Sequence, residues 1–297
     1  MFSGSIVALV TPFKDGSLDE EGLGRNIRFQ MENGTSALVP CGTTGESPTL
    51  DIQEWVRVVS IAVEEAGGRV PVIAGTGTNS TKQSVERTRM AGELGAAAAL
   101  VVTPYYNKPT QEGLYRHYRQ VAEDGGLPVV LYNVPGRTGV NLEPDTVYRL
   151  SRIGGVVAVK EASGNLTQAS EIVRRCGDGF TLLSGDDALT LPLLSVGASG
   201  VISVAANIVP ADVADMVSHF TSGRLDEARK LHHRLAPIFK ALFLETNPIP
   251  VKAAMSALGM PAGKPRLPLT ELAQSNEDSL KAALVDYGLE PEGSCPE

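Results

Sequence analysis

The sequence predicts an α/β protein, a (β/α)8 barrel with a C-terminal helical appendage. Short apolar runs rich in valine, isoleucine and alanine recur roughly every 25 to 35 residues. The runs do not alternate with polar residues, as is typical of parallel strands that are covered on both faces. Stretches with helical periodicity separate them, so strand and helix alternate along the chain. Consecutive βα units of this kind favour a closed barrel, with an open doubly wound sheet as the alternative.

Eight apolar runs are the expected strands. They begin at Ser5, Ser36, Arg69, Ala97, Leu127, Gly155, Phe180 and Ser199. Helix-start signals lie between them. Asp51 and Ser80 precede periodic segments as N-caps, and Pro144 opens another at a first helical position.

No strand pattern follows residue 223, so we expect residues 1–223 to form the barrel and residues 224–297 a C-terminal helical domain. Apolar residues at spacings of three and four begin at Leu225, and two further helical segments cover 247–259 and 269–288. The acidic, proline-containing end at 289–297 is expected to fray.

Composition excludes several classes of function. The 297 residues include 26 Lys plus Arg and 34 Asp plus Glu, a net charge of -8, which argues against a nucleic-acid-binding surface. No apolar run reaches the ~18 residues that a membrane helix needs, and the first residues lack the basic segment of a signal peptide. We therefore expect a cytoplasmic protein. Its cysteines, Cys41, Cys176 and Cys295, have no CxxC spacing for zinc or a disulfide framework.

Reactive groups of a barrel lie at the carboxyl ends of its strands, and the sixth expected strand gives the clearest signal there. In VVAVKE, alternation places Val156, Ala158 and Lys160 on one face, a small apolar row that ends in a single amine. If this row faces inward, Lys160 is buried at the barrel mouth and suited to Schiff-base formation with a carbonyl substrate. With the opposite strand phase, Lys160 is an ordinary paired lysine.

The fifth strand adds two candidates at the same end. Tyr132 lies at the level of Lys160 and could move protons, or it could be a core aromatic residue whose hydroxyl binds backbone. Arg137 follows in the loop NVPGRTG and could hold a carboxylate through a bidentate contact, or be a surface arginine.

Two loops extend the candidate site. After the second strand, CGTTGES presents Thr43 and Thr44 between glycines, a turn that could bind a carboxylate or phosphate or merely cap a helix. After the fourth strand, TPYYNKP presents Tyr105 and Tyr106 between prolines, which indicates an interface, a lid or a packed loop.

Other motifs do not indicate sites. GTGTNS at 75–80 lacks the third glycine of a dinucleotide fingerprint. The four histidines have no metal-ligand spacing. Asp186 and Asp187 after the seventh strand are explained as well by helix capping as by ligand binding.

Four motifs together resemble a known family: GTTGE, TPYYNKP, YNVPGRTG and VKEASGN. The chain is similar to the dihydrodipicolinate synthases over roughly residues 3 to 270, within the wider superfamily of pyruvate-dependent aldolases. That superfamily includes N-acetylneuraminate lyase and keto-deoxy sugar acid aldolases, which share GTTGE and the tyrosine and lysine. An arginine at the position of Arg137 is more typical of the synthases, where it holds the carboxylate of aspartate semialdehyde.

The resemblance implies that Lys160 forms a covalent imine with pyruvate, which becomes an enamine and attacks aspartate semialdehyde, with no metal or organic cofactor. Tyr132 would carry protons, and Thr44 would link it to Tyr106 from the neighbouring subunit. Thr43 and the turn amides would hold the pyruvate carboxylate. Two further positions, Gly185 and the carbonyl of Ile202, would line the pocket.

The implied product is 4-hydroxy-tetrahydrodipicolinate, in the diaminopimelate route to lysine. A tyrosine shared between subunits makes a homo-oligomer part of the function, and family members are commonly homotetramers. A sugar acid aldolase of the same superfamily and a non-enzymatic small-molecule binding protein remain the alternatives.

Feedback by lysine is expected to be weak or absent. Lysine-inhibited relatives carry histidines at the positions of Ile52 and Trp55 and a glutamate at that of Gln83. The residues present here offer no carboxylate to an ammonium group. Another acid such as Glu46 could substitute with a different geometry.

Overall fold

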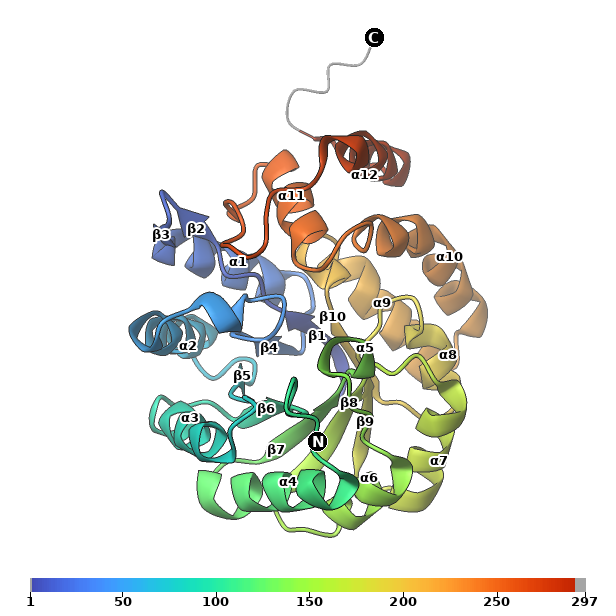
Figure 1. Ribbon diagram of the computed structural model, residues 1–297. Coiled ribbons are helices and arrows are strands. Elements are labelled where there is room, and N and C mark those ends of the chain that lie inside the picture. The colour runs from blue at the N-terminus through green and yellow to red at the C-terminus, as the bar shows by residue number, and fades with distance from the viewer. Residues whose placement is uncertain (1, 292–297) are drawn as a thin grey trace.

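The computed structural model describes residues 2–291 and contains a closed barrel of eight parallel strands (Figure 1). The sheet order is β4-β1-β10-β9-β8-β7-β6-β5, and a bridge between Leu38 and Val72 joins its two ends. The predicted barrel is therefore confirmed, and the open-sheet alternative is wrong. The strands are β1 (Gly4–Ala8), β4 (Ala37–Val39), β5 (Ile73–Gly75), β6 (Ala98–Val102), β7 (Val129–Asn133), β8 (Val156–Glu161), β9 (Thr181–Ser184) and β10 (Gly200–Ser203).

Helices surround the strands on the outside of the barrel (Figure 1). The expected N-caps are present: Asp51 forms a capping box with Glu54, and the Ser80 side chain accepts a hydrogen bond from the amide of Gln83. The surrounding helices are α1 (Glu20–Glu32), α2 (Ile52–Ala66), α3 (Thr81–Glu93), α4 (Gln111–Gly125), α6 (Pro144–Ser151), α7 (Leu166–Cys176), α8 (Thr190–Ser195) and α9 (Pro210–Thr221).

Several short helices and strands lie in the loops of the barrel. Three of them follow strands at their carboxyl ends, where the candidate site lies. They are η1 (Ser47–Thr49), α5 (Pro135–Thr138) and η2 (Ala205–Asn207), and a small hairpin of β2 (Phe13–Lys14) and β3 (Ser17–Leu18) follows β1.

The segment after the barrel folds as three helices, α10 (Leu225–Ala241), α11 (Ile249–Ala257) and α12 (Gln274–Tyr287). Helix α12 begins at residue 274 rather than at the expected 269. The segment around α11 lies beside the N-terminal part of the chain (Figure 1), and the amide of Phe13 donates to the Ala262 carbonyl over 3.0 Å. The predicted division after residue 223 stays a prediction, and most of the predicted frayed end, 292–297, lies outside the described residues.

Side chains of alternate strand residues fill the barrel interior and include Val130, Tyr132 and Ala158. One expectation about this row is wrong. Val156 packs in the outer core, and Val157 packs against the interior, because the pairing register shifts between β7 and β8: Val129 pairs with Val156, but Val130 pairs with Ala158. This irregularity adds one residue to β8 and reverses the phase of its first residues.

No helix within the described part of the chain is both long and apolar enough to span a membrane.

Candidate active site at the carboxyl ends of the strands

Lys160 and Tyr132 form the centre of the candidate site. They are direct register partners on β8 and β7, and the Lys160 Nζ lies 4.4 Å from the centroid of the Tyr132 ring. Both residues are buried, with exposed fractions of 5% and 6%. Within residues 2–291, the Lys160 amine has no ion-pair or hydrogen-bond partner. The inward phase is therefore present, and the lysine is not an ordinary paired one.

Two predicted pocket residues come from the next two strands in the sheet order, at the end of β9 and on β10. Gly185 directly follows β9, and a Cβ atom there would lie 3.1 Å from the Lys160 Cγ and 2.7 Å from the Ala162 Cβ. Any side chain at this position would therefore press on the stem of the lysine. Ile202 lies on β10 in the same interior cluster as Tyr132, and it is 1% exposed.

The turn after β4 brings Thr43 and Thr44 to the same end of the barrel. Its backbone is unusual: Cys41 and Glu46 have φ values of 55° and 52°, in the left-handed region. Gly45 allows a close approach, because a Cβ there would lie 3.1 Å from both the Cys41 amide and the Leu9 carbonyl. The turn closes through the Glu46 amide, which donates to the Thr43 carbonyl over 3.1 Å.

Arg137 is exposed at the rim of the site, on the short helix α5. Its Nη2 donates to the carbonyl oxygen of Asn247 over 3.0 Å, and no carboxylate among the described residues pairs with it. The side chain of Asn247 is buried and donates in turn to the Thr44 Oγ1 over 3.0 Å. One residue from the C-terminal segment thus contacts both Thr44 and Arg137.

A cavity of about 350 Å³ opens at this end of the barrel. Of the predicted residues, Thr43, Tyr132 and Arg137 line it, together with Tyr105 from the predicted tyrosine loop. The other predicted residues in this part of the barrel, Lys160, Thr44, Gly185 and Ile202, are not among the lining residues. Cys41 also lines the cavity, but burial raises the pKa of its thiol far above neutral, which keeps the thiol protonated.

Tyr106 is the one predicted residue that stands apart from the others. It is 89% exposed, and its φ of 72° lies in the left-handed region that side chains other than glycine rarely adopt. The next residue, Asn107, is held to the loop before α3 by a hydrogen bond to the Asn79 carbonyl. The backbone therefore presents Tyr106 outward instead of toward the cavity of its own chain.

The two aspartates after β9 bind backbone amides. Asp186 accepts from the amides of Ala188 and Leu189 before α8, and Asp187 accepts from those of Val204 and Ala205 after β10. Burial raises the pKa of Asp187, and these amides partly oppose that effect. The capping interpretation is not borne out: Leu189 is the N-cap residue of α8, which has no side-chain cap, and Asp186 instead orders the turn before the helix. Asp187 joins the loop after β9 to the segment after β10.

The positions expected to matter for a lysine effector have different environments. Trp55 is fully buried, and its ring N–H donates to the Gly75 carbonyl over 3.0 Å. Ile52 is 42% exposed and has no polar atom on its side chain. Gln83 lines the 350 Å³ cavity, and so does Arg87, a cation that the sequence prediction did not consider.

Comparison with known proteins decides the family. The family model described as the dihydrodipicolinate synthetase family matches residues 1–286. The chain belongs to this family. It is 57% identical to a 4-hydroxy-tetrahydrodipicolinate synthase of Geotalea uraniireducens over 97% of this chain and 100% of that protein. The resemblance found in the sequence is thereby confirmed, and with it the assignment to lyase-type class I aldolases.

Solved structures of family members agree with this fold. A dihydrodipicolinate synthase of Aquifex aeolicus superposes with a TM-score of 0.96 at 50% identity, over 98% of this chain and 100% of that one. A chloride-inhibited family member of Acinetobacter baumannii, solved in complex with pyruvate, superposes with a TM-score of 0.95 at 44% identity. That alignment covers 97% of this chain and 100% of the other.

Two contacts at the site were not predicted from the sequence. Asn247 begins the motif NPIPVKAA, which belongs to the resemblance, but nothing in that pattern points to Thr44. Glu46 pairs with Lys252, a second buried lysine, over 2.6 Å. Both contacts join residues more than 200 positions apart, so no local spacing carries them.

Proposed function

We propose that this protein condenses pyruvate with aspartate semialdehyde to give 4-hydroxy-tetrahydrodipicolinate, through an imine on Lys160. The observation that carries the proposal is the unpaired amine of Lys160, buried 4.4 Å from the Tyr132 ring centroid at the mouth of the barrel. An amine that is not held in an ion pair is available to attack a ketone. Family membership supports the choice of reaction.

The chemistry follows from the electron demand of an imine. The Lys160 amine adds to the pyruvate ketone, and loss of water gives the imine. The imine withdraws electrons, so the adjacent methyl group can lose a proton to form an enamine. The enamine carbon then attacks the aldehyde of the second substrate, and the amine of that substrate displaces Lys160 as the ring closes. Tyr132 is the proton carrier of these steps.

Substrate binding is divided between the turn after β4 and the rim. Thr43 and the amides of its turn hold the pyruvate carboxylate, while Gly185 and the carbonyl of Ile202 leave room for the three-carbon unit. Arg137 holds the carboxylate of the semialdehyde. Its outer position supports this role, because it lies at the cavity rim and not at the level of the imine.

The proton relay is completed across a subunit interface. Thr44 links Tyr132 to Tyr106 of a neighbouring copy, and the oligomer is a homotetramer. The 89% exposure of Tyr106 and its left-handed backbone support this arrangement, since a single chain turns the phenol away from its own cavity. Cytoplasmic location and independence from organic cofactors stay predictions.

Borohydride reduction in the presence of pyruvate tests the proposal. We expect a reduced three-carbon acid on Lys160, mapped by mass spectrometry, and no adduct in Lys160→Ala. Lys82→Ala, which changes an exposed lysine, is the matched control and should trap normally. An adduct on Lys252 or Lys108 would overturn the assignment.

The choice between condensation and sugar acid cleavage needs a second assay. The protein with pyruvate should consume aspartate semialdehyde and should not cleave keto-deoxy acids. Cleavage of such an acid at a rate above that of condensation would favour the sugar acid aldolase instead. Absence of any adduct would favour a binding protein.

A further inference from the structure

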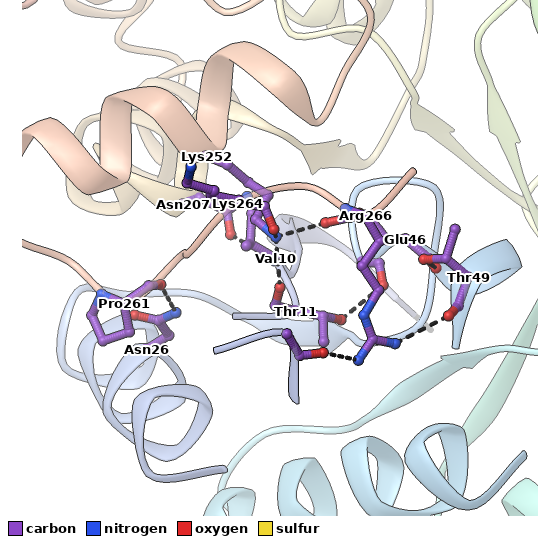
Figure 2. A network of polar contacts seen from close by, with 12 residues as sticks. Val10, Thr11, Asn26, Glu46, Thr49, Asn207, Lys252, Pro261, Lys264 and Arg266 are labelled. Carbon is purple, nitrogen blue, oxygen red and sulfur yellow. Dashed lines mark hydrogen bonds and ion pairs between the residues drawn. The ribbon is translucent and has the colours of Figure 1, made fainter. Parts of the chain in front are cut away.

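A buried polar network joins Glu46, at the end of the turn after β4, to Lys252 and Arg266 of the C-terminal segment (Figure 2). Glu46, two residues after Thr44, points away from the cavity toward the C-terminal segment. One carboxylate oxygen contacts the Lys252 Nζ over 2.6 Å, and the other accepts the amide of Arg266 over 2.8 Å. The side chains of Glu46 and Lys252 are each 1% exposed.

The Lys252 ammonium uses its full donor capacity. Besides Glu46, its Nζ donates to the Thr11 carbonyl over 3.2 Å and to the Lys264 carbonyl over 3.4 Å. An ammonium group has three protons, and three acceptors surround this one. The ring of Phe13 lies 4.4 Å from the same nitrogen.

Arg266 extends the network to the elements after the turn. Its guanidinium makes a bidentate contact with Glu54 on α2, with both distances 2.6 Å, and donates to the Thr49 carbonyl over 3.1 Å. It also donates to the Gly16 carbonyl over 2.8 Å. The C-terminal segment therefore holds the chain at residues 46, 49 and 54.

A buried ion pair is a poor way to gain stability, because desolvation of both charges offsets their attraction, and apolar residues of similar size would serve as well. Such a pair does impose one geometry on the groups that it joins. Here the joined group is the closing residue of the turn, whose amide donates to the Thr43 carbonyl.

We propose that Glu46 and Lys252 are positioning residues, through which the segment around α11 fixes the turn that binds and activates pyruvate. The inference rests on the proposed function, since it assigns the purpose of the network to the pyruvate-binding turn. Lys160 comes from β8, which the network does not contact, so imine formation itself does not depend on the pair.

The test compares a single with a double substitution. Lys252→Met leaves the Glu46 carboxylate buried and unpaired and should lower the midpoint of unfolding. Glu46→Met combined with Lys252→Met removes both charges and should regain most of the lost stability. The double variant should still give full borohydride adduct at saturating pyruvate.

Two readouts separate positioning from folding. The first is the rate at which the methyl protons of pyruvate exchange with heavy water, divided by the number of adduct-forming sites. This rate should be at least tenfold lower in the double variant than in the unmodified protein. The second is KM for pyruvate, which should rise at least tenfold in the double variant. Arg28→Met, which breaks the exposed Arg28–Glu65 ion pair, is the control and should change neither value.

A folded double variant whose KM and exchange rate stay within twofold of the unmodified protein would overturn the inference. If the double variant does not fold, Arg266→Gln tests the outer, partly exposed half of the network. It should raise KM for pyruvate about threefold, and an unchanged KM would count against the inference. The proposed function fails separately, if the unmodified protein forms no adduct with pyruvate.

Discussion

Substitution of Arg137 should separate the two substrates of the reaction. The guanidinium lies at the cavity rim, and its one hydrogen bond within residues 2–291 goes to the Asn247 carbonyl. Arg137→Ala removes the proposed contact to the semialdehyde carboxylate but no contact to Lys160 or Tyr132. A charge-assisted hydrogen bond contributes about 1.5 to 3 kcal/mol. Because the arginine is exposed, solvent screening reduces this contribution. We therefore expect a loss of about 2 kcal/mol, or about thirtyfold in kcat/KM for the semialdehyde.

The assay measures both steps on the same preparation. Pyruvate trapping by borohydride should proceed at the normal rate in Arg137→Ala, while condensation falls. Arg137→Lys is the matched variant: it keeps the charge but loses the planar fork, so its activity should lie between those of Arg137→Ala and the unmodified protein. An equal loss in trapping and condensation would refute the reasoning, because it would mean that the arginine shapes the whole pocket.

Three further predictions follow from the structure. Mixing inactive Tyr106→Phe and Lys160→Ala chains and refolding them together should restore about a quarter of full activity. Half of the dimers are then mixed, and each mixed dimer holds one intact site out of two. No recovery despite proven mixing would confine the relay to one chain. Free lysine added up to millimolar concentration should leave the rate of condensation unchanged. The reason is that Trp55 is buried with its N–H donor occupied and that Gln83 carries no charge. Strong inhibition well below a millimolar would contradict this prediction. Burial lowers the pKa of His117 to about 4, so the unfolded chain takes up a proton below pH 6.5 and the folded chain does not. Stability should fall as the pH drops from 6.5 toward 4, by about 2 kcal/mol at pH 5 in denaturant titrations, and His117→Gln should remove that part of the loss.

The fold could be predicted because its signals are local. Parallel strands covered on both faces must be apolar throughout, and each run from Ser5 to Ser199 became a strand. Helix starts were equally direct at Asp51 and Ser80, where a side chain satisfies free backbone amides. The register shift between β7 and β8 at Val157 was not predictable, because the run is apolar whether or not it contains one extra residue.

The site was predictable in part for the same reason. Lys160 and Tyr132 are each next to last on consecutive strands, so strand geometry alone places them side by side. Asn247 and Lys252 reach the turn after β4 from a segment about 200 residues away, and their contacts depend on how α11 packs against the barrel. The burial of Trp55 also depends on packing: its sequence position predicts a helix, but not that its N–H binds Gly75.

Two buried lysines in one fold show why residue type alone does not identify a nucleophile. Burial lowers the pKa of the Lys252 amine, while the adjacent Glu46 opposes that effect and stabilises the ammonium form. Three acceptors surround the Lys252 nitrogen, so its protons are engaged and its position is fixed. Lys160 is buried to a similar degree, but within residues 2–291 it faces an aromatic ring and no carboxylate. The presence or absence of one acidic neighbour thus agrees with the two proposed roles, Lys252 as an anchor of the turn and Lys160 as the covalent nucleophile.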